Sequence, residues 1–409
     1  MPWLTEADIA NALSHYNYDI RQSNNARWID QKCTPDVVCI VSDCIENYAR
    51  DNGDVPFSSV DVWHDTYTTT NVEQIFSKPG LNLGASRNEY DKFFQQPMEL
   101  LAYAGVLQKH KRGNRNFYSV VQPDLLSYIA MRERNALSFL QVYIEKVLTD
   151  SDLLEYFEEF FRLQTPESYA EVKSKFEDFT IANTPINGRT ECRRIFTKIM
   201  NPLAFKRRSH GTEKGRLSQH IITYDMLMYN RDNFRDLYAE KPKGVTRQEY
   251  ADQVGATPNE RYYVYMAGRA KRFLREYNDR YRAGRPEVLT GPDTDSPAIH
   301  MHHIFPESRY PEISAFLENL IALTPTQHLT FAHPMGNTQI VDLAYQHICL
   351  IAKAATIQEN LAGDEELIIY EFTKLLYVLN VGLATDEFEE VNDMDFDGII
   401  TKIELRYAG

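Results

Sequence analysis

The sequence predicts an α+β protein that is mostly helical and contains more than one domain. Its 409 residues exceed the usual length of a single domain. Helical spacing of apolar residues dominates residues 124–179, whereas residues 106–109 and 117–120 have the composition of short strands. Hydrophobic residues make up 43% of the chain, which is enough for sizeable cores. The buried helical stripe is expected to contain Leu125, Ile129, Leu137, Leu140, Ile144 and Leu148.

Residues 1–123 are expected to form an N-terminal α+β domain. Ser86 and Glu89 have capping-box spacing at the start of a helix, Pro97 begins or kinks a second segment, and Gly105 ends it. The two short strands then enclose a basic tip at residues 111–115. A helix followed by a hairpin with a basic tip resembles a winged-helix DNA-binding module over residues 30–122. An ordinary α+β packing unit is the alternative.

Charge is distributed unevenly along the chain, although the net charge is −14. Residues 189–216 hold nine Lys and Arg against two acids, and residues 261–285 hold eight against two. A local basic face attracts a phosphate backbone whatever the net charge, although a solvated helix face is the alternative for either run. We therefore expect residues 124–290 to be a helical region that contacts DNA. The expected contacts are Arg193, Arg194, Lys206, Arg207, Arg208, Arg269, Lys271 and Arg272.

A histidine-rich motif follows a break in the chain that is rich in glycine and proline. It begins with His300-Met301-His302-His303-Ile304-Phe305-Pro306. Asn319 follows later in the chain, and His328 is the ninth residue after Asn319. Residues 298–305 and 317–324 are typical of two short strands, and Thr324-Pro325 is a helix start that places His328 in the first turns. Residue types, order and spacing resemble the HNH, or ββα-metal, nuclease motif.

The resemblance implies a catalytic unit at residues 291–361 and a role for each motif residue. His303 would be the general base, and Asn319 would orient that base or join the metal shell. His302 and His328 would bind a divalent ion, most simply Mg²⁺ or Mn²⁺, with Zn²⁺ or Ni²⁺ as alternatives. His333 is a third candidate ligand, although it follows His328 by five residues where colicin-type members have four. His300 is a substitute ligand or an ordinary polar strand residue.

The residues themselves support part of this assignment. Neighbours on a strand point to opposite faces, so His302 and His303 suit one ligand and one base better than two ligands. The chain has no C-x-x-C pair for a structural zinc site, so packing must hold the fold around the histidines. A helical stripe after the motif is expected to do this, formed by Val341, Ala344, Tyr345, Ile348, Ile351 and Ala355.

The function predicted from these features is metal-dependent cleavage of double-stranded DNA. The basic region and the N-terminal domain favour sequence-specific double-strand cleavage, as in a type II restriction endonuclease acting as a homodimer. One alternative is a homing or phage-type HNH nickase. The other is a non-catalytic DNA-binding regulator that retains a relict nuclease fold.

Residues 362–409 form an acidic C-terminal segment. Asp393, Asp395, Asp397, Gly398 and Glu404 fit the spacing of an EF-hand loop, but the segment is acid-rich throughout, so we expect a solvated acidic tail, with a Ca²⁺ site as the alternative. The N-terminus lacks the order of a signal peptide, no apolar run is long enough to span a membrane, and the five cysteines form no C-x-x-C pair. We therefore expect a cytoplasmic protein that does not bind membranes.

Overall fold

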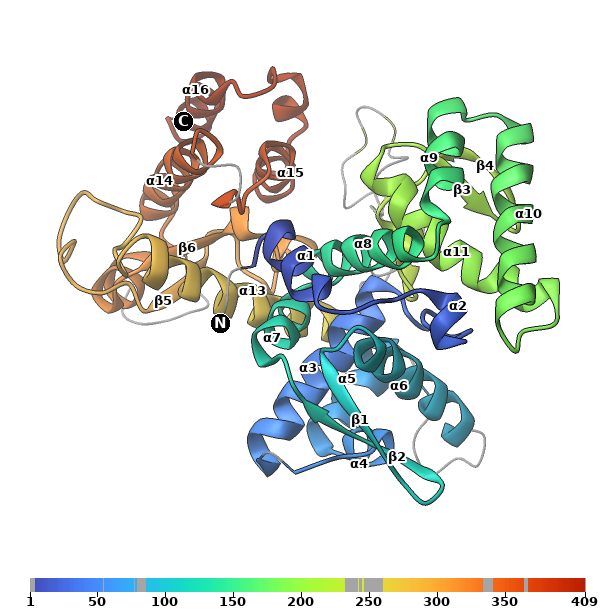
Figure 1. The fold of residues 1–409 in the computed structure, drawn as a ribbon. Coiled ribbons are helices and arrows are strands. Elements are labelled where there is room, and N and C mark those ends of the chain that lie inside the picture. The colour runs from blue at the N-terminus through green and yellow to red at the C-terminus, as the bar shows by residue number, and fades with distance from the viewer. Residues whose placement is uncertain are drawn as a thin grey trace. The chain divides into compact units, whose positions relative to one another are not determined.

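The computed structural model describes residues 4–53, 55–76, 78, 86–231, 242, 245, 260–333, 341–363 and 367–408. The chain divides into two compact units, Met1–Arg235 and Asp236–Gly409 (Figure 1). The described part is mostly helical and contains three small antiparallel sheets of two strands each, as the α+β prediction required. The division falls inside residues 124–290: the first basic run packs within unit 1, and the second packs with the strands of the histidine motif in unit 2.

Unit 1 contains eleven described helices and two hairpins. The helices are α1 (Glu6–Ser14), α2 (Ile20–Ser23), α3 (Pro35–Asn52), α4 (Ser59–Trp63), α5 (Thr66–Phe76), α6 (Ser86–Tyr103), α7 (Pro123–Met131), α8 (Glu133–Asp150), α9 (Leu154–Leu163), α10 (Pro166–Asn183) and α11 (Arg189–Lys206). The strands are β1 (Leu107–Arg112), β2 (Arg115–Val120), β3 (His210–Glu213) and β4 (Arg216–Ile221), followed by the 3-10 helix η1 (Asp225–Leu227).

The core of unit 1 forms where α3, α7 and α8 pack together. All six apolar residues of the stripe expected between Leu125 and Leu148 are buried, which confirms that prediction. The region after residue 189 differs from expectation. A helical region was expected there, but the 18-residue helix α11 is followed by the hairpin β3–β4.

Before the first hairpin, the chain passes from α3 through a short extended stretch at Phe57 and then through three helices. After α3, Phe57 bridges Tyr118 of β2, with Phe57 N donating to Tyr118 O at 2.9 Å and Tyr118 N donating to Phe57 O at 2.7 Å. Helices α4, α5 and α6 follow, and β1 and β2 then pair antiparallel around the basic tip, with Leu107 opposite Val120. A helix followed by a hairpin with a basic tip is therefore present, as the sequence pattern indicated. Helix α6 continues through Pro97 instead of dividing there.

Gly105 allows the chain to leave α6 and enter β1. Its φ of +80° lies in the left-handed region, and a Cβ at this position would lie 2.4 Å from the ring of Tyr16. Any larger residue would therefore be both strained and too close to that ring.

Unit 2 contains the histidine motif. Its helices are α13 (Glu260–Tyr281), α14 (Leu343–Leu361), α15 (Phe372–Gly382) and α16 (Phe396–Tyr407), and its strands are β5 (His300–His303) and β6 (Leu320–Leu323). Short turns are the 3-10 helices η3 (Pro311–Ile313), η4 (Leu317–Asn319) and η8 (Glu387–Glu390), and the π-helix η5 (Gln327–Ala332). Strands β5 and β6 pair antiparallel, with His300 opposite Leu323 and His303 opposite Leu320.

A buried ion pair joins the hairpin β5–β6 to the helix behind it. Lys353 of α14 lies 2.7 Å from Glu287 Oε2, and both side chains are almost fully buried. Glu287 also accepts a hydrogen bond from Ala322 N of β6 at 2.9 Å, and its own N donates to Ala322 O. Burial lowers the pKa of Lys353 while Glu287 opposes that shift. Breaking one partner of such a pair typically costs about 3–5 kcal/mol, because the remaining charge is left uncompensated.

Two expectations about the C-terminal part of the chain are wrong. Helix α14 forms, but its buried face carries Gln346, Cys349, Leu350, Lys353 and Ala354, and Ile348 of the expected stripe is exposed. The EF-hand loop does not form, because α16 begins at Phe396 with Asp395 as its N-cap, so Asp397 and Glu404 lie on a helix. The acidic segment is a folded part of unit 2, with Phe396, Ile399 and Ile403 buried.

None of the described helices combines the length and the apolar character needed to cross a bilayer. All five cysteines are free and buried.

Candidate active site

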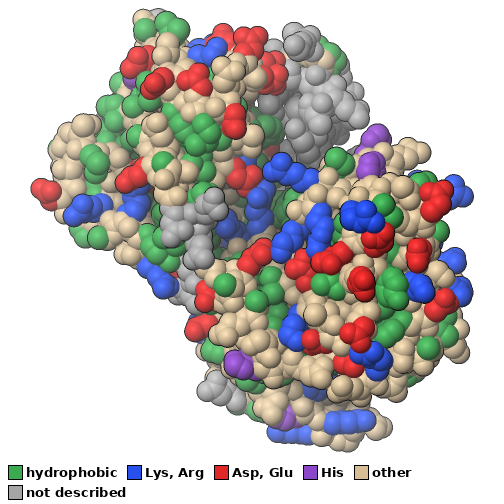
Figure 2. All heavy atoms as spheres, turned by 45° about the horizontal axis from the view of Figure 1, so that its top comes forward, with side chains coloured by type: hydrophobic (Ala, Val, Ile, Leu, Met, Phe, Trp, Pro, Cys, Tyr) green, Lys and Arg blue, Asp and Glu red, His purple; other side chains and the backbone are tan. Residues whose placement is uncertain are grey.

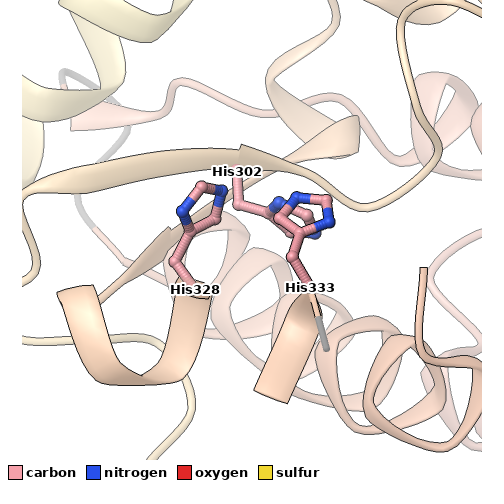
Figure 3. A group of neighbouring side chains, drawn as sticks. All are labelled: His302, His328 and His333. Atoms are coloured by element: carbon pink, nitrogen blue, oxygen red, sulfur yellow. The ribbon is translucent and has the colours of Figure 1, made fainter. Parts of the chain in front are cut away.

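Three histidines from separate places in unit 2 converge on one point. His302 is on β5, His328 is on η5, and His333 directly follows η5. One nitrogen from each ring lies within 4.8 Å of the other two, and Figure 3 shows the three rings turned toward one another. The ring centroids of His302 and His328 are 5.0 Å apart, and those of His302 and His333 are 4.9 Å apart. All three were expected as ligands from the sequence, and the structure brings them together.

The π-helical turn explains why His333 belongs to this group. His333 N donates to His328 O at 3.1 Å, which is the five-residue hydrogen bond of a π-helix. His328 and His333, five residues apart, are therefore separated by one helical turn, as residues four apart are in an α-helix. The segment begins with a reciprocal cap, because Gln327 N donates to Thr324 Oγ1 and Thr324 N donates to Gln327 Oε1, both at 3.2 Å.

The surroundings of His302 and His328 favour their neutral forms. Burial, and then the neighbouring histidines, hold the pKa of His302 well below its usual range. Burial and His333 lower the pKa of His328 to about 4. Neutral imidazoles carry the lone pair that a metal ion needs, so the cluster is prepared for a cation at neutral pH.

His300 contacts the cluster from the same strand face as His302. Its Nδ1 lies 2.9 Å from Nδ1 of His328, so one of these nitrogens donates to the other. The contact commits Nδ1 of His328 and leaves its Nε2 available to a ligand. His300 is therefore placed to orient His328, in the manner of the outer partners that metal-binding histidines commonly have.

His303 is held in one tautomer on the opposite side of the strand. Its Nε2 lies 2.8 Å from the carbonyl oxygen of Ser314, and because a carbonyl can only accept, Nε2 carries the proton. Nδ1 is consequently the basic atom, and the nearest carboxylate oxygen, on Glu307, is 3.8 Å away. Burial, followed by the positive charge of Lys271, lowers the pKa of His303 to about 4. The side chain is a neutral proton acceptor at pH 7.

The histidines line a pocket of about 880 Å³ that lies within unit 2. Lys271 and Tyr263 of α13 form one side of it, and Glu307 and Pro311 of the loop after β5 form another. A pocket of this size admits a nucleotide-sized group beside the ligand nitrogens. Lys271 and Glu307 were not recognised from the sequence as pocket residues, because they lie 31 residues before and four residues after His302–His303 with no motif linking them.

Asn319 hydrogen-bonds to the backbone of the segment between β5 and β6. Its side chain is fully buried, accepts from Phe305 N at 2.8 Å, and donates to Phe305 O at 3.0 Å and Ile313 O at 3.3 Å. It is not among the residues that line the pocket. Asn319 therefore ties together the two ends of the loop that carries Ser314, the partner of His303.

The eight residues expected to contact DNA are divided between the two units. Five lie in unit 1, and four of these are paired with carboxylates: Arg193 with Glu177, Arg194 with Glu191, and both Lys206 and Arg207 with Glu145. Arg208 is exposed. In unit 2, Arg269 is buried against Tyr265, Lys271 lines the pocket, and Arg272 is exposed. Counting charges along the sequence therefore overstated the free basic surface of α11.

No family model matches this chain, and no curated protein or solved structure was found to match it. The argument for function therefore depends on the geometry of the pocket.

Proposed function

We propose that this protein is a metal-dependent DNA endonuclease of the HNH class. The observation that carries the proposal is the pairing of a three-histidine cluster with a separate, neutral histidine in one pocket. Phosphodiester hydrolysis needs a proton acceptor for water and positive charge beside the phosphate, and this pocket offers residues for both.

His302, His328 and His333 would hold the ion, which would supply positive charge to the phosphate and the departing oxygen. Three imidazole nitrogens without a carboxylate suit a transition ion better than Mg²⁺, so we propose Mn²⁺, Zn²⁺ or Ni²⁺ before Mg²⁺. His303 Nδ1 would accept the proton of the attacking water, while the hydrogen bond to Ser314 holds the ring in place. Lys271 would attract the phosphate into the pocket.

The finer proposal is sequence-specific double-strand cleavage by a homodimer. The described residues contain one such histidine cluster, and one cluster acts on one strand at a time. A double-strand break therefore needs two chains, arranged with the two-fold symmetry of a duplex site. A monomer that only nicks duplex DNA would instead support the nickase alternative.

Plasmid DNA incubated with the protein and Mn²⁺ tests the proposal directly. The intact protein is expected to produce linear fragments, and His303→Ala should reduce the rate by about 10²–10⁴ while leaving DNA binding unchanged. Excess Mn²⁺ should partly rescue His328→Ala but not His303→Ala. A protein that shifts DNA in a gel without cutting it under any of these ions would favour the non-catalytic regulator. Cutting by His303→Ala at the normal rate would refute the proposed base.

A further inference from the structure

The histidine pocket has an apolar half that the proposed chemistry does not use. Tyr263 and Val264 of α13 line it, together with Ile299 just before β5 and Met301 on β5. Val264 is 51% exposed and Ile299 is 43% exposed, so this half of the pocket is open to a ligand. An ion held by the histidines and one phosphate would fill only a small part of a pocket of about 880 Å³.

The position of these apolar side chains distinguishes them from the rest of the surface. Figure 2 shows hydrophobic side chains in small groups among charged and polar ones on the face it presents, and scattered exposure of this kind is normal. The pocket instead gathers apolar side chains from α13 and from the segment entering β5, and α13 packs against β5. Apolar walls with a few convergent polar groups are typical of sites for organic ligands. The apolar half is therefore suited to an organic group of the substrate.

Helix α13 presents a charge and an apolar group on one face. Val264 and Lys271 are seven residues apart, close to two helical turns, so their side chains lie on the same side of the helix and about 10 Å apart along its axis. Both line the pocket. With the phosphate near Lys271, an apolar group attached to that phosphate would reach Val264. A nucleotide has this construction, with an anionic phosphate at one end and a flat base at the other.

Tyr263 offers an aromatic ring to such a base. It is partly buried, and its ring meets that of the buried Tyr262 edge to face, with 5.7 Å between the ring centroids. An aromatic ring is a stacking platform for a nucleobase of any sequence. In an intact duplex, however, each base is paired and stacked between its neighbours, so the base must leave the stack before its face can reach a side chain in a pocket.

We infer that the nucleotide at the cleaved phosphate is unpaired in the complex, with its base against Tyr263, Val264 and Ile299. The inference rests on the proposed endonuclease function, because it takes the histidine cluster as the site of the scissile phosphate. It adds the substrate class, which is a DNA strand whose nucleotide at the cut is mismatched, bulged or turned out of the helix. Mismatched and unpaired nucleotides cost the least to place in a pocket, since less pairing and stacking is lost.

Binding of three duplexes to the metal-free, full-length protein tests the inference without cleavage. One duplex carries a single unpaired adenine, the second carries an abasic residue at the same place, and the third is fully paired. Fluorescence anisotropy should show that the intact protein binds the adenine duplex about 5- to 100-fold more tightly than the abasic one, the range for one base stacked on an aromatic ring. The paired duplex should also bind more weakly than the adenine duplex. Equal affinities for the adenine and abasic duplexes would overturn the inference.

Two double variants that remove side chains of similar size separate the pocket from the general surface. Val264→Ala with Ile299→Ala removes apolar groups of the pocket and should reduce the preference for the unpaired adenine. Leu343→Ala with Ile348→Ala removes groups of α14 that are 67% and 41% exposed and are not among the lining residues, and should retain the preference. Equal losses in both variants would contradict a base site in the pocket.

The ring of Tyr263 is tested separately. Tyr263→Ala should remove the preference for adenine over the abasic residue, whereas Tyr263→Phe, which keeps the ring, should retain it. Circular dichroism melting establishes that each variant is folded. Sedimentation velocity of Val264→Ala with Ile299→Ala gives a further check. If that variant loses self-association and keeps the adenine preference, the apolar half is an interface between copies of the chain and the inference is wrong.

Cleavage of the same duplexes separates this inference from the proposed function. An intact protein that cuts DNA with Mn²⁺ but shows no preference for the unpaired adenine refutes only the inference. An intact protein that prefers the unpaired adenine but cuts none of the duplexes with Mn²⁺, Zn²⁺ or Ni²⁺ refutes the endonuclease proposal and supports the base site.

Discussion

His328 and His333 are one turn apart because the backbone between them is a π-helix. The hydrogen bond from His333 N to His328 O, at 3.1 Å, closes a turn that contains one residue more than an α-helical turn. Their ring centroids lie 4.9 Å apart as a result. The wider π-helical turn therefore places the side chains at i and i+5 on one face, as an α-helical turn does for the side chains at i and i+4.

Deleting Thr330, which is exposed, should convert the π-turn to an α-turn and leave both rings on one face. We expect the deletion variant to bind Mn²⁺ within about tenfold of the intact protein, since an α-turn also aligns i and i+4. His333→Ala should weaken binding by more, because it removes one of three ligands. Isothermal titration of metal-free protein with Mn²⁺ measures both. If the deletion variant binds Mn²⁺ more weakly than His333→Ala does, the π-turn itself is needed for binding.

The pH dependence of cleavage should depend on Lys271. Burial and the charge of Lys271 lower the pKa of His303 to about 4, so the base remains unprotonated down to about that pH. Removing the charge in Lys271→Gln should raise this pKa toward 6.5, and the acidic limb of kcat should then move to higher pH. The measurement is kcat against pH at saturating Mn²⁺, with Lys402→Gln as a control in the same unit. If the acidic limb of kcat lies at the same pH in Lys271→Gln as in the intact protein, a group other than His303 sets that limb.

Asn319→Ala should reduce stability and rate together. The substitution removes three hydrogen bonds to backbone groups of a buried loop, and buried polar groups left without partners cost about 1–3 kcal/mol each. The loop carries Ser314, so His303 loses its fixed orientation as well. Urea unfolding followed by circular dichroism, with plasmid cleavage in parallel, should show both losses. His303→Ala, by contrast, should lose rate alone. Normal activity in Asn319→Ala would show that the loop does not position the base.

Removing the metal should leave the protein folded. The core of unit 2 is held by the Glu287–Lys353 pair, the Asn319 bonds and the apolar faces of α14, α15 and α16, none of which includes a ligand histidine. Chelation should therefore abolish cleavage without changing the far-UV circular dichroism spectrum. Saturating metal should add only linkage stabilisation, about 2.7 kcal/mol at a hundredfold excess over Kd. Unfolding on chelation would show that the ion is structural.

The local parts of the fold could be predicted from the sequence. Strands β5 and β6, the hairpin β1–β2 and helix α13 follow from short-range periodicity and from turn residues, and their positions are confirmed. The grouping of His302 with His328 follows from the same short segment. His333 was a candidate ligand too, but the sequence could not show how a spacing of five residues brings it to His328, because the π-helical turn between them does not follow from short-range periodicity.

The errors come from polar residues whose partners are distant in the sequence. The buried face of α14 was misassigned because Lys353 is polar in the sequence yet buried beside Glu287, 66 residues earlier. Arg193 and Lys206 of α11 pair with Glu177 and Glu145 of other helices, which the count of charges along the sequence could not show. The motif likewise identified Asn319 by type without showing that its amide hydrogen-bonds to backbone groups.

The division of the chain between residues 235 and 236 has an evolutionary consequence. All residues that line the histidine pocket lie between Tyr263 and His333, inside the second unit. Substitutions at distant, independent sites have nearly additive effects. Descendants of this chain are therefore expected to accumulate changes on the surface of the first unit while the pocket histidines stay constant.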